Sequence, residues 1–164
     1  MRFHIDHIVA VAPAHPEATV VLCGPQAMDL SPLEAVPNIV YLGAIPYDEL
    51  PAYASRFDVG LMPYLRNEFV EACNPIKLKE YLALGFPVAS IDFPELAPYA
   101  DVVHTATDEP TFLAAVDAAL AEVGDTAEAQ RRRAMVAEDD WDVIADECER
   151  LLRLSATPPV PPRG

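Results

Sequence analysis

Short apolar runs, each closed by turn residues, recur along this chain and constrain its fold more than any other feature. A continuous run of Val, Ile and Leu is typical of a strand buried on both faces, as strands are in parallel sheets. Helical stretches at 3–14 and 48–57 separate some of these runs. The alternation predicts an α/β fold, with a Rossmann-like open parallel sheet flanked by helices. The expected strands are residues 19–23, 39–42, 59–62, 88–91 and 102–104.

The most sharply delimited helix is predicted over residues 75–84. Asn74 is a preferred N-cap residue, Pro75 suits the first helical position, and Gly85 suits the residue after the end. Three independent signals therefore agree on where this helix begins and ends.

The C-terminal third carries two further helices, expected over residues 111–123 and 141–154, each with one apolar stripe. Trp141 heads the second stripe and is expected to anchor the last helix to the domain. The proline-rich tail, residues 156–164, cannot continue a helix and is expected to be extended or disordered. Residues 1–155 are therefore expected to form one domain.

Charge and composition narrow the classes of partner. Asp and Glu outnumber Lys and Arg 26 to 11, a formal net charge of −15 that disfavours nucleic acid and anionic membranes. No apolar stretch approaches the ~20 residues of a membrane span, and no signal-peptide pattern opens the chain. The three cysteines lie far apart without metal-ligand spacing, so we expect no metal site and a cytoplasmic protein.

Both lysines of the chain, Lys77 and Lys79, fall in the first turns of the 75–84 helix. Positive side chains there oppose the helix dipole, so their placement favours a phosphate group bound at this end. Glu80, on the same face as Lys77, is suited to hydrogen-bond sugar hydroxyls. The alternative is an ordinary surface ion pair between Lys77 and Glu80, with Lys79 solvated. Dinucleotide, Walker, esterase and zincin motifs are absent from the sequence.

An ordered series of short motifs carries a family resemblance. The series is LCGP at 22–25, PNIVYLG at 37–43, LPAY at 50–53, FDVGLMP at 57–63, NPIK at 74–77 and EYLALGFPV at 80–88. It resembles the C-terminal half of group 1 glycosyltransferases, which are retaining enzymes of the GT-B fold that use nucleotide-sugar donors. The resemblance covers roughly residues 1–155.

The resemblance implies a donor pocket and assigns its residues. Glu80 matches the glutamate that binds the nucleotide ribose, and Lys77 matches the lysine that approaches the diphosphate; both are assigned to catalysis. Asn74, Pro75 and Ile76 match the segment that binds the diphosphate and the donor sugar. The loop that borders the base is matched by Gly43, Ile45 and Tyr47. The implied activity is that of a hexosyltransferase that needs no cofactor beyond its donor.

Two departures from the family pattern qualify this interpretation. Ala72 stands where many members carry a further glutamate. The chain also starts after the point where the family has its first strand, which is central in the strand order 3-2-1-4-5-6, and after the acceptor domain. We therefore expect a sheet that closes without that strand or exposes an edge, with self-association or a missing acceptor domain as partner, and little turnover alone. The alternative function is a non-catalytic binding or assembly module.

The remaining polar residues are expected to have ordinary roles. His4 and His7 are interpreted as helix-surface residues rather than metal ligands. The arginine run 131–133 is interpreted as a solvated helical face with local ion pairs. Tyr64, and with it Arg66 and Asn67, follows the end of an expected strand, the side on which open α/β sheets bind ligands.

Overall fold

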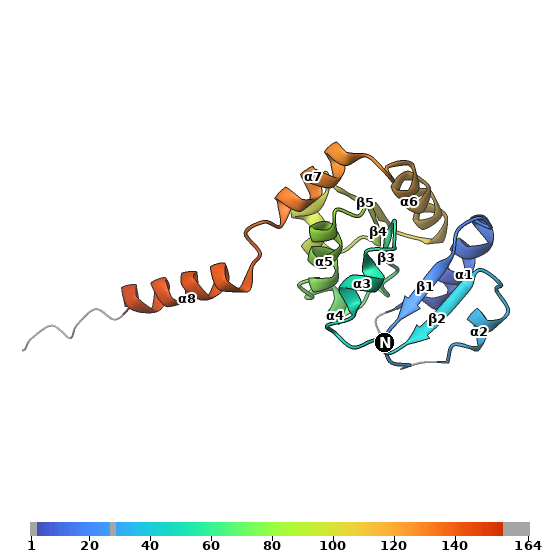
Figure 1. Ribbon diagram of the computed structural model, residues 1–164, viewed down its shortest axis with the longest axis horizontal. Coiled ribbons are helices and arrows are strands. Elements are labelled where there is room, and N and C mark those ends of the chain that lie inside the picture. The colour runs from blue at the N-terminus through green and yellow to red at the C-terminus, as the bar shows by residue number, and fades with distance from the viewer. Residues whose placement is uncertain (1–2, 27–28, 156–164) are drawn as a thin grey trace, which may run out of the picture.

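All five predicted strands are present and pair in parallel, which confirms the α/β fold with parallel sheets flanked by helices (Figure 1). The computed structural model describes residues 3–26 and 29–155. The strands pair β1 with β2, and β3 with β4 and β5. Their bounds are β1 Val20–Cys23, β2 Ile39–Gly43, β3 Gly60–Met62, β4 Val88–Ile91 and β5 Val103–Ala106.

Helices connect successive strands, as the sequence predicts. The 3–14 helix begins later than expected, because Phe3 forms a bridge with Tyr64 ahead of it. The 48–57 helix is also shorter than expected. The helices are α1 Ile5–Ala14, α2 Ser31–Glu34, α3 Leu50–Ala54, α4 Glu68–Glu71, α5 Ile76–Leu84, η1 Pro94–Tyr99, α6 Glu109–Ala121, α7 Thr126–Met135 and α8 Trp141–Ser155. None of the helices described is long and apolar enough to cross a membrane. The 156–164 tail lies outside the described residues.

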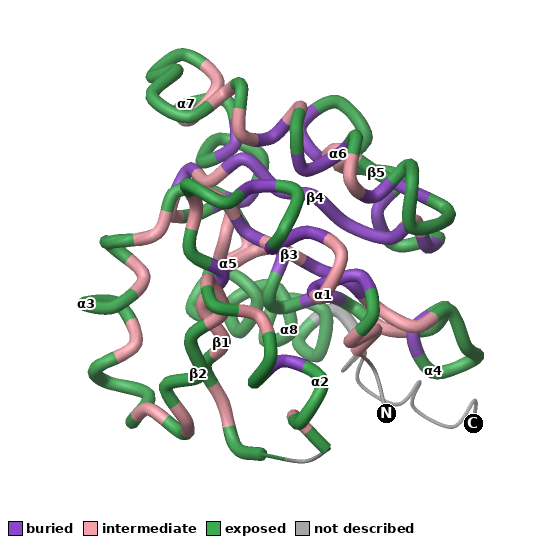
Figure 2. Tube along the Cα trace, turned by 90° about the vertical axis from the view of Figure 1, so that its right-hand side faces the viewer, coloured by how far each residue is buried: buried purple, intermediate pink, exposed green. Residues whose placement is uncertain are grey.

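The sheet does not close: β1 and β2 form one sheet, and β3, β4 and β5 form another. Because β1 and β3 pair on one side only, each presents an edge, as the sequence led us to expect. β4 is central in its sheet, and all four of its residues are buried, whereas only the first residue of β1 is (Figure 2).

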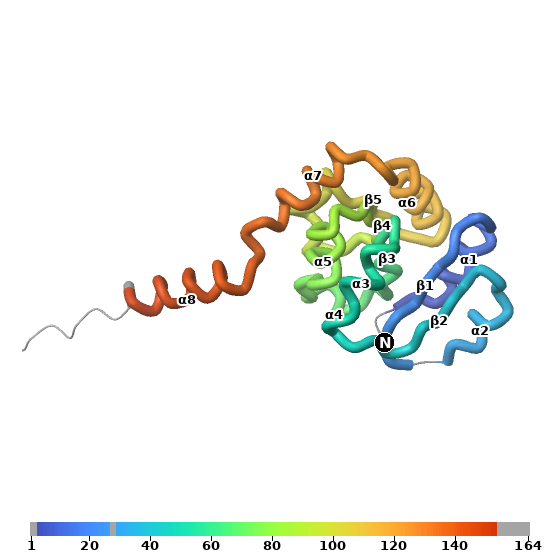
Figure 3. Tube along the Cα trace, viewed as in Figure 1, coloured from blue at the N-terminus to red at the C-terminus, as the bar shows by residue number. Residues whose placement is uncertain are grey.

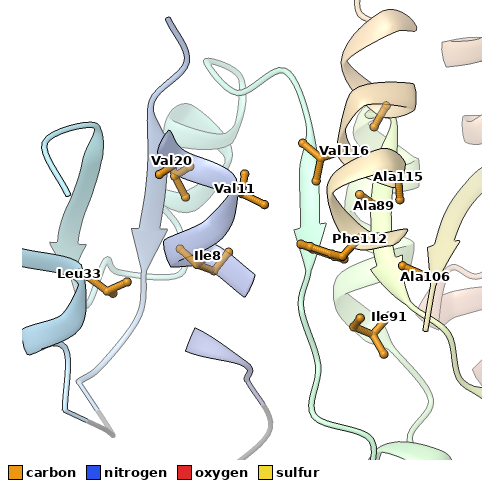
Figure 4. Packing of buried hydrophobic residues seen from close by; sticks show 12 residues of the cluster. Ile8, Val11, Val20, Leu33, Ala89, Ile91, Ala106, Phe112, Ala115 and Val116 are labelled. Atoms are coloured by element: carbon orange, nitrogen blue, oxygen red, sulfur yellow. The ribbon is translucent and has the colours of Figure 1, made fainter. Parts of the chain in front are cut away.

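One hydrophobic cluster joins the two sheets, between which the described part of the chain forms no strand ladder. Ile8 and Val11 of α1 pack with Val20 of β1, and Phe112 of α6 packs with Ile91 of β4 in the same cluster (Figure 4). Phe112 is fully buried, and its ring stacks on that of His7 with centroids 5.2 Å apart. Side-chain packing between α1 and α6 therefore holds the two sheets together.

The prediction for α5 is correct at its C-terminal end and wrong at its N-terminal end. Gly85 ends the helix in the left-handed conformation, at φ +84°, as predicted. The N-cap is Pro75 and no side chain caps the helix, so the prediction for Asn74 is wrong. The main chain turns early instead, with the carbonyl oxygen of Asn74 accepting a hydrogen bond from the backbone N–H of Ile76 at 3.0 Å.

The arginine run on α7 binds the C-terminal end of α5. Arg132 donates to the carbonyl oxygen of Gly85 at 3.3 Å, and Arg133 donates to that of Leu84 at 2.8 Å. Arg132 is 1% exposed and also pairs with Glu122. The predicted solvated face is therefore wrong for Arg132, because α5 has no basic residue in its own last turn and its final carbonyls need donors. Arg131 is exposed and pairs with Glu128, as expected.

The last helix, α8, does not pack against the rest of the molecule. It projects from the body beyond α7 (Figures 1 and 3), and each of its side chains that the structure describes is exposed. Trp141 is 76% exposed, so its predicted role as a packing anchor is wrong. The apolar stripe is present as the sequence indicates, but within the described residues nothing covers it.

Candidate functional site

Two hydrogen bonds join the chain segments at the carboxyl ends of β1 and β2. The backbone N–H of Gly24 donates to the carbonyl oxygen of Gly43 at 2.8 Å, and the Tyr41 hydroxyl donates to the carbonyl oxygen of Gly24 at 2.8 Å. Gly24 and Gly43 both have a positive φ, +140° and +74°, a conformation that residues with a side chain rarely adopt. In the Gly43 loop, Tyr47 is 80% exposed and Ile45 is half-buried. The loop assigned to the base is therefore open to solvent.

The start of α5 lies at the same edge of the molecule. Since α5 follows β3 and leads into β4, its N-terminal end meets the carboxyl end of β3. Burial raises the pKa of the Cys23 thiol at the end of β1, and the nearby Lys77 ammonium opposes this shift. Lys77 is thus close to the end of β1, although β1 and β3 belong to different sheets.

Lys77 and Glu80 form an exposed ion pair. The Nζ of Lys77 donates to the Oε2 of Glu80 at 2.8 Å, and the side chains are 55% and 35% exposed. An exposed pair of this kind contributes about 0–1 kcal/mol to stability, so ligand groups can replace it at little cost. The surface ion pair considered from the sequence is present, and it leaves both groups accessible to a ligand.

The side chain of Lys79 does not join the Lys77–Glu80 pair. Its Nζ donates to the Oδ1 of Asp139 at 2.8 Å, in the segment between α7 and α8. This hydrogen bond raises the pKa of Lys79. The two lysines therefore do not converge on one ligand, and Lys79 is not solvated as the alternative interpretation assumed.

Tyr81 sets the position of α5 against the sheet. Its hydroxyl pKa is raised to about 12, chiefly by burial and further by Tyr64 and Glu80. A Cβ at Gly60 would lie 2.5 Å from the Cδ2 atom of Tyr81, so the ring requires glycine in β3. The sequence analysis missed this contact, although a glycine inside a predicted strand indicates close packing of a neighbour. The contact fixes the helix that carries Lys77 and Glu80.

The other predicted site residues surround the start of α5. Asn74 and Ile76 are exposed, and Pro75 is buried. Asn67 caps α4, since its side-chain oxygen accepts from the backbone N–H of Val70 at 3.0 Å. Arg66 lies 3.8 Å from Glu71 in an exposed ion pair.

A hollow of about 340 Å³ lies at the opposite end of α5. Gly85, Phe86 and the α7 residue Arg132 line it, together with Glu122. Arg132 and Glu122 pair with each other there, and Arg132 also holds the carbonyl oxygen of Gly85. This hollow is therefore a packing junction between α5 and α7, and it is separate from the Lys77 end.

The two N-terminal histidines stack on each other, with ring centroids 4.0 Å apart. His7 is 6% exposed and lies between His4 and Phe112, so its interpretation as a helix-surface residue is wrong. The reason is that α1 turns this side chain toward α6. In residues 3–26 and 29–155, no three His, Cys, Asp or Glu side chains are grouped to hold a metal ion.

Acidification is expected to destabilise the fold through His7. Burial, and secondarily the charge of His4, lowers the pKa of His7. Below about pH 6.5 the unfolded chain therefore binds a proton that the folded protein does not, and the free energy of unfolding falls as pH drops toward the lowered pKa. Urea titrations at pH 7.5, 6.5 and 5.5 measure this dependence. His7→Phe should reduce its slope, and an unchanged slope would exclude His7 as the cause.

Comparison with known proteins agrees with the motifs at this edge of the fold. Residues 1–153 match the family model described as "Glycosyl transferases group 1". The Bacillus subtilis (strain 168) protein named "Putative teichuronic acid biosynthesis glycosyltransferase TuaH" is 30% identical over 138 residues, covering 79% of this chain. The chain spans 34% of that relative's length, about one third. On the family match, which extends over nearly the whole chain, this protein belongs to the group 1 glycosyltransferases.

Proposed function

We propose that residues 1–155 bind the nucleoside diphosphate part of a sugar donor at the N-terminal end of α5. The observation that carries the proposal is the exposed Lys77–Glu80 pair at 2.8 Å, placed where α5 meets the ends of β1 and β3. No side chain caps the start of α5, where the helix dipole favours an anion, and Lys77 adds a full positive charge. Family membership supports a nucleotide-sugar as the ligand.

The proposed site assigns a different part of the donor to each residue. Lys77 leaves Glu80 and pairs with the diphosphate, while the carboxylate of Glu80 accepts hydrogen bonds from the ribose hydroxyls. The exposed loop from Gly43 to Tyr47 borders the base. Asn74, Pro75 and Ile76 set the backbone that faces the diphosphate and the sugar.

The proposed reaction moves a hexose to a hydroxyl acceptor in the cytoplasm. The bond between the sugar C1 and the diphosphate oxygen breaks, the acceptor oxygen bonds to C1, and its proton is released. Lys77 and the helix dipole stabilise the negative charge that develops on the leaving diphosphate. The acceptor is held by a further domain, which this chain needs for turnover, consistent with its spanning one third of its relative.

The second candidate is a module that binds the donor or assembles with a partner without catalysing transfer. Ala72, in place of the further glutamate that the family often carries, favours it. The two candidates share the donor site and differ in turnover. Addition of a separate acceptor domain restores transfer only if the first candidate is correct.

Calorimetry with UDP and GDP tests the site directly. Lys77→Ala and Glu80→Ala are expected to weaken binding of the preferred nucleotide by about 10- to 100-fold, since each removes a charged hydrogen bond. Lys79→Ala is the matched control, because this lysine lies on the same helix but pairs with Asp139. It should bind within about twofold of the parent. Binding of neither nucleotide, or equal binding by the Lys77 and Glu80 variants, contradicts the donor site.

A further inference from the structure

The hydroxyl of Tyr41 reaches from β2 across to the turn that follows β1. In the strand ladder Tyr41 lies opposite Leu22, and its hydroxyl donates to the carbonyl oxygen of Gly24, two residues farther along, at 2.8 Å. The backbone N–H of Gly24 donates to the carbonyl oxygen of Gly43 at 2.8 Å. Both polar backbone groups of Gly24 are therefore held by β2, one through a side chain and one through the main chain.

The pairing of β1 with β2 is irregular at this corner, which consists of residues 22–24 and 41–43. Leu22 lies opposite Tyr41, but the next residue, Cys23, lies opposite Gly43, so Leu42 is an extra residue in β2. A bulge of this kind disrupts the ladder locally and bends the strand. The hydroxyl bond of Tyr41 spans the point at which the ladder is disrupted.

Two glycines make the corner dependent on its hydrogen bonds. Gly24 and Gly43 both have a positive φ, and a Cβ added at either would meet nothing within 4 Å beyond its chain neighbours. No packed atoms therefore hold either residue on that side, and glycine loses more conformational freedom on folding than any other residue. The Tyr41 bond is the one hydrogen bond described above that a substitution can remove, because the Gly24–Gly43 bond joins main-chain groups.

The corner faces the start of α5. The Lys77 ammonium opposes the rise in the pKa of the Cys23 thiol, and Cys23 in turn contributes to the raised pKa of the Tyr81 hydroxyl on α5. Both effects require the end of β1 to lie near α5, although β1 belongs to the other sheet (Figure 1). Gly43 begins the 43–47 loop, so the corner connects that loop to the surroundings of Lys77.

We propose that Tyr41 is a positioning residue for nucleotide binding, which holds the 43–47 loop at the distance from Lys77 that a nucleoside diphosphate spans. This role rests on the donor site proposed above, and Tyr41 acts through Gly24 and Gly43 rather than on the donor itself. Without the hydroxyl bond the loop populates other conformations, and the apparent affinity falls with the fraction that remains in the binding conformation. The loss is confined to ligands that carry a base.

Calorimetry on Tyr41→Phe separates this role from a general structural one, because the variant keeps the ring and loses only the hydroxyl. Binding of UDP or GDP, whichever the parent chain prefers, should weaken by about 3- to 10-fold, the effect of one lost hydrogen bond. Binding of inorganic pyrophosphate, which has no base, should stay within about twofold of the parent. Lys77→Ala should weaken both ligands. Equal weakening of the two ligands by Tyr41→Phe, or of neither, overturns the proposal.

Hydrogen exchange of the free chain tests the Tyr41 bond without a ligand. In Tyr41→Phe the amides of Gly24 and of the 43–47 loop should exchange at least about fivefold faster than in the parent, because local opening becomes easier. Tyr99→Phe is the matched control: Tyr99 lies beside Asp139 in η1, between β4 and β5 in the chain, and its loss should leave this exchange unchanged. Unchanged exchange in Tyr41→Phe overturns the proposal.

The donor site and the role of Tyr41 fail in different ways. A parent chain that binds neither UDP nor GDP contradicts the donor site, and the role of Tyr41 with it. A nucleotide that the parent and Tyr41→Phe bind equally well contradicts the role of Tyr41 alone.

Discussion

Phe112→Ala is expected to lower the free energy of unfolding by about 4 kcal/mol, within the range for removing a fully buried aromatic ring. Phe112 is 0% exposed and stacks on His7, so it joins α6 to α1. Among the residues described, no strand ladder links the two sheets. The cavity would therefore open the contact that connects them. Urea denaturation measures the loss, and hydrogen exchange locates it.

The exchange pattern distinguishes this account from a uniform loss of stability. Amides of β1 and β2 should lose protection before those of β4, because β4 is hydrogen-bonded on both sides within its own sheet. Phe112→Leu keeps most of the buried surface and should cost about 1 kcal/mol. If Phe112→Ala and Phe112→Leu are equally stable, the cluster does not hold the sheets together.

Arg132→Ala is expected to destabilise the protein by about 3 kcal/mol, at the lower end for a broken buried ion pair because Glu122 is partly exposed. The variant also leaves the carbonyl oxygen of Gly85 without its donor. For a chain of this length the loss corresponds to a Tm lower by about 6–12 °C. Thermal unfolding followed by circular dichroism measures it.

The neighbouring arginine supplies the control for this prediction. Arg131→Ala removes the same charge from an exposed position on α7 and should change the stability by less than about 0.5 kcal/mol. Arg132→Met/Glu122→Gln removes both charges and should recover part of the loss. Equal effects of the Arg131 and Arg132 substitutions would show that net charge, and not the buried pair, is responsible.

The strands of this fold could be predicted from the sequence because their signal is local. A strand buried on both faces must be apolar at successive positions, and residues 88–91 satisfy this in β4. Gly85 likewise marks the end of α5, because the left-handed conformation there is a property of a single residue. Such features require no knowledge of what lies nearby in space.

The contacts that the sequence analysis missed join residues far apart in the chain. Arg132 meets Gly85 across 47 positions, and Lys79 meets Asp139 across 60. Nothing in an arginine run or a lysine pair specifies such a partner. The sequence therefore predicts a solvated face for the arginines and, for the lysines, a bound phosphate group or, in the alternative, a local ion pair with Lys79 solvated. The exposure of Trp141 was missed for the opposite reason, since an apolar stripe indicates a contact surface but not whether the same chain covers it.

In the candidate site, too, the local features could be predicted from the sequence and the contacts between distant residues could not. The i, i+3 spacing of Lys77 and Glu80 places them on one helix face and is readable from the sequence. The proximity of Lys77 to Cys23 depends on how the two sheets are arranged, and it is visible only in the folded structure. The sequence therefore predicts which helix carries the candidate site, but it does not predict that the end of β1 lies near Lys77.

The bond between Lys79 and Asp139 links the segment just before α8 to the middle of α5. Lys79 sits half a turn beyond Lys77, and Asp139 is two residues before Trp141. The helix that carries Lys77 and the segment that leads into α8 are therefore joined by a side-chain bond as well as through the chain. Asp139→Ala, which removes the acceptor, would leave α8 joined to α5 through the chain alone.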